Sequence, residues 1–478
     1  MSDLFAGYTS DGFCEAFAHG EARPHYAGLT RRLGALAPDE MVARASLMES
    51  TLRRQGITFA VYGEAGGTER TWPLDLVPRL IPADEWSHVE RGLSQRVRAL
   101  NAFLEDLYVG EQTALRDGVV PRWLVESSPG YAREAVGIRV PSGARCIVSG
   151  IDIVRDGDGV YRVLEDNLRV PSGVAYVLEN RAALSRVLAV AFEGERVRPV
   201  HHYGASLLRT LSEVAPRGMS DPTVVVLTPG VFNSAHFEHV FLARQMGVEL
   251  VEGRDLVVED ARVHMRTTRG LQQVDVIYRR IGDDSLDPVI FDPGSLLGVP
   301  GLMSAVRAGN VTLANAVGNG VIDDKALYPF VPGLIRHYTG EEPILPNVTT
   351  YHPWDPDQLD AVLPRLDRLV VKPTNESGGY GIVIGSRATD AELAKAADDL
   401  RRDPRSFIVQ ETVQLSTHPT WLEGRMVPRH IDLRPFVLAG RDVEVLPGGL
   451  TRVALREGSL IVNSSQGGGS KDTWVLAA

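Results

Sequence analysis

Apolar residues in the first 125 positions recur mainly at helical spacing. In residues 39–55, and again in residues 86–107, they return about every 3.6 residues. The stretch between them, residues 74–82, is interrupted by Pro78 and Pro82, which predicts a connector. We therefore expect a mainly helical N-terminal region over residues 1–125.

From residue 126 the pattern changes to short apolar runs of β type. Residues 145–154 and 160–164 form two such runs, separated by the turn sequence Arg-Asp-Gly-Asp-Gly. Two apolar runs joined by strong turn residues predict a β-hairpin. A helix is expected to follow over residues 174–192.

The predicted hairpin carries Asp152 on its first strand and Glu165 and Asn167 at the end of its second. Residues two apart on a strand project from the same face, so Asp166 should point the other way. Carboxylate and amide oxygens are hard ligands suited to Mg²⁺, which makes the three residues candidate metal ligands. A solvated turn rich in acidic residues explains the same pattern equally well.

Residues 223–251 have the pattern of a β-α-β unit. A short apolar run over 223–227 is followed by a Thr-Pro-Gly turn, a helix over 235–246 and a second apolar run over 248–251. Such a unit implies parallel strands and a doubly wound sheet. Further strands are expected over 274–278 and 311–314, with a helix near 302–307 between them.

The last third of the chain alternates again between strands and helices. Strands are expected over 369–372, 382–384, 407–410, 430–438 and 451–455, with a helix over 391–400. Because Trp474-Val475-Leu476 would be unusual in a disordered tail, we expect the C-terminus to pack back onto the protein.

The clearest candidate chemistry lies at Lys372, where an apolar strand ends on a lysine. The loop behind it contains Asn375, Ser377, Gly378, Gly379 and Gly381. Glycines let backbone N–H groups wrap an anion, and a lysine adds a point charge, so the segment suits phosphate groups. It is not a Walker loop, because Gly-Lys-Ser/Thr is missing and no helix follows. The alternative is an ordinary hairpin with a lysine at the end of a strand.

The composition narrows the function classes. The chain has 478 residues and a net charge of −11, which argues against a general nucleic-acid binder. Its two cysteines are too few for a disulfide scaffold or a cysteine metal site. Neither a signal peptide nor an apolar run long enough for a membrane helix is expected, so the cytoplasm is the expected location.

Several long segments together resemble the circularly permuted ATP-grasp proteins, which are related to the synthetase domain of glutathionylspermidine synthase. The resemblance spans about residues 145–478, and the order of its motifs makes it specific. The motifs are Val163-Leu164-Glu165-Asp166-Asn167-Leu168-Arg169-Val170-Pro171-Ser172-Gly173, Tyr278-Arg279-Arg280-Ile281-Gly282-Asp283, Asn319-Gly320-Val321-Ile322-Asp323-Asp324-Lys325, the Lys372 segment and Ser464-Ser465-Gln466-Gly467-Gly468-Gly469-Ser470-Lys471-Asp472.

The resemblance implies an α/β fold with the two halves of an ATP-grasp in permuted order, because the predicted metal ligands precede Lys372. It implies a metal-binding half over residues 126–215 and a nucleotide-binding half over 321–478. The β-α-β domain over 216–320 would be an inserted, pre-ATP-grasp-like domain.

The resemblance also implies roles for individual residues. Lys325 and Lys372 would contact the phosphates of ATP, and the loop from Asn375 to Gly381 would fold over them. Gln410 and Glu411 would lie near adenine, although an ordinary strand end explains them as well. Mg²⁺ would be held by Asp152, Glu165 and Asn167, and Lys471 would reach the nucleotide or the reaction centre.

Family members join a carboxylic acid to an amine or thiol through an acyl phosphate. The leading hypothesis is therefore an ATP- and Mg²⁺-dependent carboxylate–amine ligase, acting on a small-molecule or peptide carboxylate and an amine acceptor. Arg279, Arg280 and Arg434 could clamp the carboxylate, since planar bidentate donors fit it best, but each could equally be part of a structural ion pair. The alternatives are a phosphotransferase on the same fold and a non-catalytic ATP-binding assembly protein. Homo-oligomer formation is left open.

Overall fold

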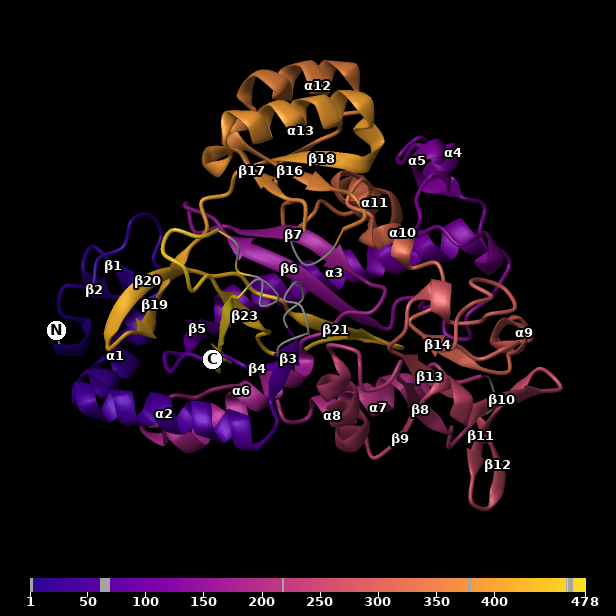
Figure 1. Cartoon of the computed structure of the whole chain (residues 1–478), viewed down its shortest axis with the longest axis horizontal. Coiled ribbons are helices and arrows are strands. Elements are labelled where there is room, and N and C mark those ends of the chain that lie inside the picture. Colours follow the sequence, from indigo (N-terminus) through magenta and orange to yellow (C-terminus); the bar gives the residue numbers. More distant parts are fainter. Residues whose placement is uncertain (1–2, 61–68, 217–218, 377–379, 461, 463–466) are drawn as a thin grey trace.

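The computed structural model describes residues 3–60, 69–216, 219–376, 380–460, 462 and 467–478. Three units position the site: a central antiparallel sheet, a parallel sheet below it and a small lobe above it (Figure 1). Among the described residues, no helix combines the length and apolar character that crossing a bilayer requires.

The central sheet contains the predicted hairpin. Strands β6 and β7 pair antiparallel, which confirms the prediction, and the C-terminal strand β21 adds to the other edge of β6. Helix α3 packs on this sheet through apolar residues at helical spacing, such as Val89, Leu93 and Leu100, which are fully buried. The bounds are β6 Val148–Arg155, β7 Tyr161–Asn167, β21 Phe436–Ala439, β22 Val443–Val445 and α3 Ala83–Tyr108.

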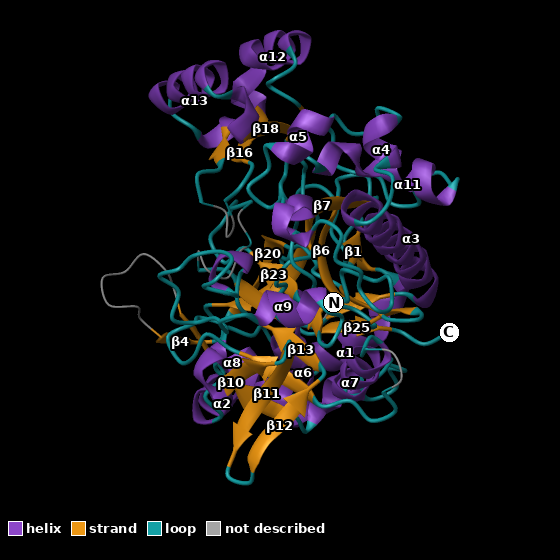
Figure 2. Ribbon diagram, turned by 90° about the vertical axis from the view of Figure 1, so that its right-hand side faces the viewer, coloured by secondary structure: helices purple, strands orange, loops and turns teal. Residues whose placement is uncertain are grey.

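The lower unit is a parallel sheet in the order β9-β8-β13-β14, as the β-α-β pattern predicts. Strand β9 lies on one side of β8 and strand β13 lies on the other, so the winding direction of the sheet changes between β8 and β13. A three-stranded meander, which the sequence did not predict, projects from this unit (Figure 2). The bounds are β8 Val224–Leu227, α8 His236–Met246, β9 Glu249–Val251, β13 Val276–Arg279, α9 Leu302–Arg307 and β14 Thr312–Ala314, with β10 Leu256–Glu259, β11 Arg262–Thr267 and β12 Gly270–Val274 in the meander.

The upper lobe has a small core of its own, in which Leu369, Val371, Leu400 and Val409 are buried. Its sheet order is β15-β18-β16-β17, covered by two helices (Figure 1). Helix α13 begins at a capping box between Thr389 and Glu392. The bounds are β15 Thr350–Tyr351, α12 Pro356–Val362, β16 Leu369–Pro373, β17 Val383–Ile384, α13 Asp390–Arg402 and β18 Phe407–Glu411.

The two ends of the chain pack together. The segment predicted as a connector contains β5, which pairs in parallel with β25 near the C-terminus, so that prediction was incomplete. Trp474 is fully buried against Phe192, which confirms that the tail packs back. The strand predicted over 430–438 is divided between β20 and β21. The bounds are α1 Ala27–Gly34, α2 Pro38–Arg54, β5 Arg79–Ile81, α6 Val174–Val187, α7 Tyr203–Glu213, α11 Val331–Thr339, β19 Thr417–Leu422, β20 Arg425–His430, β23 Thr451–Val453, β24 Gly469–Lys471 and β25 Thr473–Val475.

Candidate active site

The two faces of β7 carry different chemistry, as its alternation predicts. Asp152 lies directly across the hairpin from Glu165, and Gly150 lies across from Asn167. On the opposite face, the buried Asp166 accepts hydrogen bonds of 2.7 and 2.6 Å from Arg96. The hairpin therefore gathers Asp152, Glu165 and Asn167 on one side and keeps Asp166 for a structural ion pair.

A β-bulge adds an apolar residue to the polar face. The pairing shifts from Asp152–Glu165 to Ile153–Val163, which leaves Leu164 as the extra residue. A bulge lets consecutive side chains point toward the same side of a sheet. Leu164 and Glu165 consequently line the same pocket.

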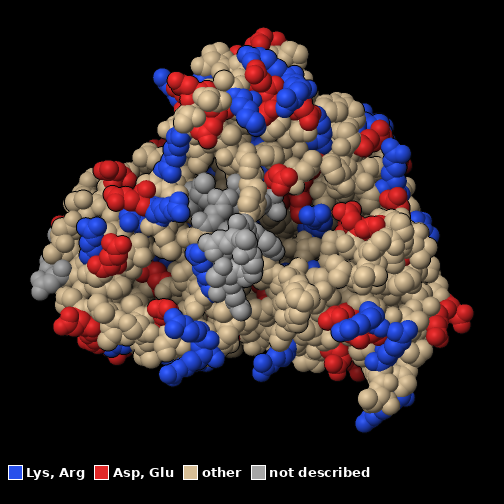
Figure 3. Space-filling view, in the orientation of Figure 1, with Lys and Arg blue, Asp and Glu red and all other residues tan. Residues whose placement is uncertain are grey.

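This pocket, called the interlobe pocket below, lies between the hairpin and the upper lobe. The surface is hollowed beneath the lobe in Figure 3, where basic and acidic side chains are interspersed. Its wall combines apolar residues with charged and polar ones from both the lobe and the hairpin. The lining residues are Asp152, Leu164, Glu165, Val370, Lys372, Ile382, Ile384, Gln410, Glu411, Thr412, Val413, Leu415, Asp432, Arg452, Leu460 and Val462.

Lys372 ends in this pocket as a buried cation. Burial lowers its pKa to about 8, and the positive charge of Lys325 acts in the same direction, while Glu165 and Asp152 oppose the shift. The Nζ atom of Lys325 lies 3.6 Å from a carboxylate oxygen of Glu165 and donates a 2.7 Å hydrogen bond to the carbonyl of Glu376. Two lysines from different chain segments thus lie beside the hairpin carboxylates, an arrangement suited to a polyphosphate.

Asp152 is the most heavily engaged of the candidate metal ligands. It accepts hydrogen bonds from Arg434 at 2.5 and 2.9 Å and from Arg452 at 2.7 Å. These two guanidinium groups lower the pKa of Asp152 well below its usual range, although burial alone would raise it. An ionised carboxylate offers about four lone-pair positions, so about one remains for a metal ion.

Glu165 and Asn167 are better placed to accept a metal ion. Glu165 is 26% exposed and lies 3.9 Å from the nearest nitrogen of Arg434. The buried Nδ2 atom of Asn167 has no hydrogen-bond partner among the described residues. In the part of the chain that the structure describes, no group of three or more His, Cys, Asp or Glu side chains could hold a metal. A mixed set of carboxylate and amide oxygens fits Mg²⁺.

Gln410 and Glu411 line the pocket, but their side chains are committed to neighbours. Gln410 donates a 3.0 Å hydrogen bond to Thr350. Glu411 accepts a 2.7 Å hydrogen bond from Tyr351 and forms an ion pair with Arg365. One polar atom of each side chain is therefore already engaged at this edge of the pocket.

Several predicted residues are absent from the pocket lining. Asn167, Lys325 and Arg434 lie next to lining residues, whereas Arg279, Arg280 and Lys471 make their contacts elsewhere. Arg279 pairs with Asp283 at 2.6 Å and donates to three backbone carbonyls, whereas Arg280 pairs with Glu238 at 2.8 Å. Lys471 is fully buried, with Asp75 and two carbonyls as acceptors. Their contacts are those of structural ion pairs.

The loop behind Lys372 is described only in part. Gly381 has a φ of +70°, and a Cβ atom there would lie 2.8 Å from Pro373, so both conformation and space require glycine. Asn375 is exposed, while Ser377, Gly378 and Gly379 lie outside the described residues.

Sequence reasoning missed much of the wall. Val370 lies two residues before Lys372 on β16, so strand alternation could have assigned it to the same face. Arg452 could not have been assigned in this way. Its hydrogen bond to Asp152 joins residues 300 positions apart, and no local sequence pattern predicts it.

Comparison with known proteins agrees with this geometry. The family model for circularly permuted ATP-grasp type 2 matches residues 78–454. The chain belongs to the circularly permuted ATP-grasp family. It is accordingly a ligase enzyme, in a family that typically uses ATP and Mg²⁺.

Similar proteins occur in several bacteria. An uncharacterized protein of Mycobacterium tuberculosis is 55% identical, over 99% of this chain and 86% of that protein. One from Synechocystis is 52% identical, over 96% of both. A Frankia alni protein named as a candidate glutamate–cysteine ligase is 46% identical, but this chain spans only 54% of its length.

A solved structure shares the fold. The apo form of a glutathione synthetase-like effector from Globodera pallida matches with a TM-score of 0.57, over 92% of this chain and 98% of that one. At 12% sequence identity this likeness concerns the fold alone.

Proposed function

We propose that this ATP-grasp ligase forms an amide or peptide-like bond through an acyl phosphate, with release of ADP and phosphate. The observation that carries the proposal is the position of Lys372 and Lys325 beside Glu165, which lines the interlobe pocket. Phosphoryl transfer depends mainly on positioning and on neutralising charge, and these groups supply both.

The pocket suggests how a nucleotide would lie. Val370, Ile384 and Leu415 offer an apolar surface for adenine, and Lys372 and Lys325 would neutralise the phosphates at the hairpin end. Glu165, Asn167 and the remaining position on Asp152 would hold Mg²⁺. When bound, Mg²⁺ supplies charge neutralisation between the phosphate oxygens.

The proposed reaction has two steps. A carboxylate oxygen of the acid attacks the γ-phosphorus, and the bond to the β–γ bridging oxygen breaks, so ADP leaves with that electron pair. The amine nitrogen then attacks the acyl carbon and loses a proton, and the carbon–oxygen bond to phosphate breaks. In the proposed arrangement, Arg434 and Arg452 keep Asp152 ionised beside the reacting groups.

Hydroxylamine trapping tests this proposal. The protein is incubated with ATP, Mg²⁺, hydroxylamine and a panel of amino acids and short peptides, with glutamate and cysteine included because of the name of the Frankia relative. We expect a hydroxamate with an equal amount of ADP, and none when the acid is omitted. AMP as the product would contradict the acyl-phosphate route, and a stable phosphorylated acceptor would favour a phosphotransferase.

The buried lysine predicts a pH dependence for ATP binding. Because burial lowers the pKa of Lys372 to about 8, its charge is present below that pH and is lost above it. Affinity measured in metal-free buffer should begin to fall as the pH approaches 8 and should then fall by up to about tenfold per pH unit. Lys372→Met should remove this transition. A profile in the intact protein that stays flat through pH 8 would argue against a phosphate contact by this lysine.

A further inference from the structure

The loop over residues 168–173, which directly follows Asn167, is held in place by side chains from other elements. Asp323 accepts hydrogen bonds from the backbone N–H groups of Leu168 and Arg169, at 2.7 and 3.3 Å. Asn315 donates to the carbonyls of the same two residues, at 2.6 and 3.3 Å. The first half of the loop therefore has its backbone groups paired without using any loop side chain.

The second half of the loop is held in the same way. Arg280 donates to the carbonyl of Pro171 at 2.7 Å, and Arg434 donates to that of Ser172 at 3.3 Å. Glu238 accepts from the N–H of Gly173 at 2.7 Å, and it is itself paired with Arg280. This gives Arg280 a structural task, which is to hold the loop behind the metal-binding hairpin.

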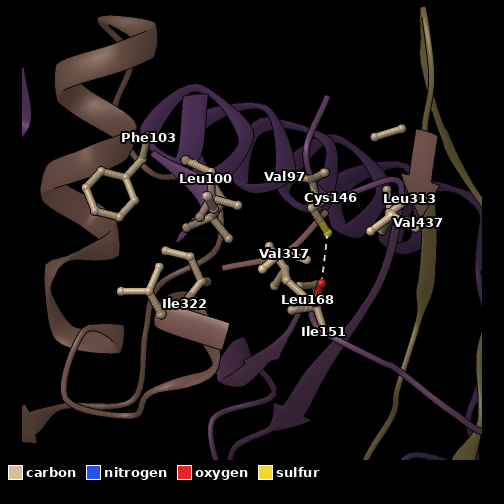
Figure 4. Close-up of a cluster of buried hydrophobic side chains, with 14 of the residues drawn as sticks. Val97, Leu100, Phe103, Cys146, Ile151, Leu168, Leu313, Val317, Ile322 and Val437 are labelled. Carbon is tan, nitrogen blue, oxygen red and sulfur yellow. Dashed lines mark hydrogen bonds between the residues drawn. The ribbon is translucent and has the colours of Figure 1, made fainter. Parts of the chain in front are cut away.

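Leu168 anchors the loop in the protein core. Its side chain is fully buried in the cluster that includes Val97 and Ile151, and its carbonyl accepts a 3.6 Å hydrogen bond from Cys146 (Figure 4). The neighbouring Arg169 is exposed instead. A backbone fixed on all sides thus presents one long cationic side chain outward.

The Arg169 side chain has no hydrogen-bond or ion-pair partner among the described residues, in contrast to Arg279, Arg280, Arg434 and Arg452. It follows Asn167, the last residue of β7, by two positions and lies in the bend after the strand. The Arg169 side chain passes close to Gly320, where an added Cβ atom would lie 3.4 Å from its Cδ atom. Arg169 is therefore an exposed cation on a fixed loop that directly follows a candidate metal ligand.

We propose that the guanidinium group of Arg169 binds the reacting carboxylate of the acid substrate and presents it to the γ-phosphate. The inference rests on the proposed ligase function. A planar guanidinium can hold both oxygens of a carboxylate, and a fixed loop costs little further ordering when the substrate binds. The same positive charge faces the negative charge that develops during phosphoryl transfer.

The test compares Arg169→Ala and Arg169→Lys with the intact protein, using whichever acid of the panel yields a hydroxamate. Arg269→Ala is the matched control, because Arg269 is an exposed arginine at the β11–β12 turn. Losing a charge-assisted pair should raise the KM for the acid by about 10- to 100-fold in Arg169→Ala. Arg169→Lys should recover only part of this loss, because lysine lacks the bidentate geometry. The dissociation constant for ATP should change by less than about twofold in every variant, because the contact that is removed is with the acid substrate and not with ATP.

The outcomes separate the two proposals. If the intact protein forms no hydroxamate with any acid, the ligase mechanism fails and this assignment fails with it. If the intact protein is active and Arg169→Ala keeps the KM for the acid, only the Arg169 assignment is overturned. A parallel loss of ATP affinity in Arg169→Ala would also overturn it, because the arginine would then be a phosphate ligand.

Discussion

Replacing Lys372 by methionine should weaken ATP binding by about 100-fold, a loss expected when a buried charged hydrogen-bond donor worth about 1.5–3 kcal/mol is removed. Methionine keeps the apolar stem of the side chain and removes only the ammonium group. The measurement is the dissociation constant for ATP by calorimetry at pH 7, where Lys372 carries its charge in the intact protein.

The same substitution should not destabilise the protein. A lysine whose pKa is lowered to about 8 is less favourable as a cation in the folded state than in the unfolded chain at neutral pH. The pKa difference corresponds to about 3 kcal/mol at most, so the thermal midpoint of Lys372→Met should be unchanged or higher. Lys395→Met is the control, because Lys395 is an exposed lysine of α13 whose partner among the described residues is Asp399. Unaltered ATP affinity in a folded Lys372→Met protein would refute the phosphate assignment.

The parts of the fold that follow from local periodicity could be predicted. Helix α3 has apolar residues at helical spacing, and the β6–β7 hairpin has two apolar runs around a Gly-rich turn. The same alternation assigned Glu165 and Asn167 to one face and Asp166 to the other, as the pairing of Asp166 with Arg96 confirms.

Features that depend on distant partners could not be predicted. Strand β5 is three residues long and lies next to prolines, and it becomes a strand only because β25 pairs with it nearly 400 positions later. Likewise, an isolated Arg-Arg pair has the donors for a substrate clamp. Only the fold reveals that Arg279 donates to Asp283 and backbone carbonyls and that Arg280 donates to Glu238.

The bulge in β7 shows why the site itself was only partly foreseen. A strict two-residue period would put Leu164 on the face opposite Glu165, but the extra residue brings both into the interlobe pocket. The polar ligands were recognised from their chemistry. The apolar wall was not, because its residues come from several elements, including β7, β16, β17 and the segments after β18 and β23, and none of these is unusual alone.

Glu165 and Asp166 are neighbouring carboxylates on β7, and removing their charges should have different effects. The Glu165 substitution should lower turnover, and the Asp166 substitution should lower stability. Glu165→Gln should lower kcat by about 100- to 1000-fold, the loss seen when one preorganised electrostatic group is removed. Its stability should hold, because Glu165 is partly exposed and its nearest basic nitrogens lie 3.6 and 3.9 Å away.

Asp166→Asn is the matched comparison on the other face of the same strand. It leaves the buried Arg96 without its charged partner, which should cost about 3 kcal/mol of unfolding free energy. The folded fraction should nevertheless keep its kcat, since Asp166 points away from the pocket. Denaturant unfolding and hydroxamate formation measured on both variants separate the two effects. If Glu165→Gln keeps full turnover, or if Asp166→Asn loses turnover without losing stability, the face of the hairpin that binds the metal has been wrongly assigned.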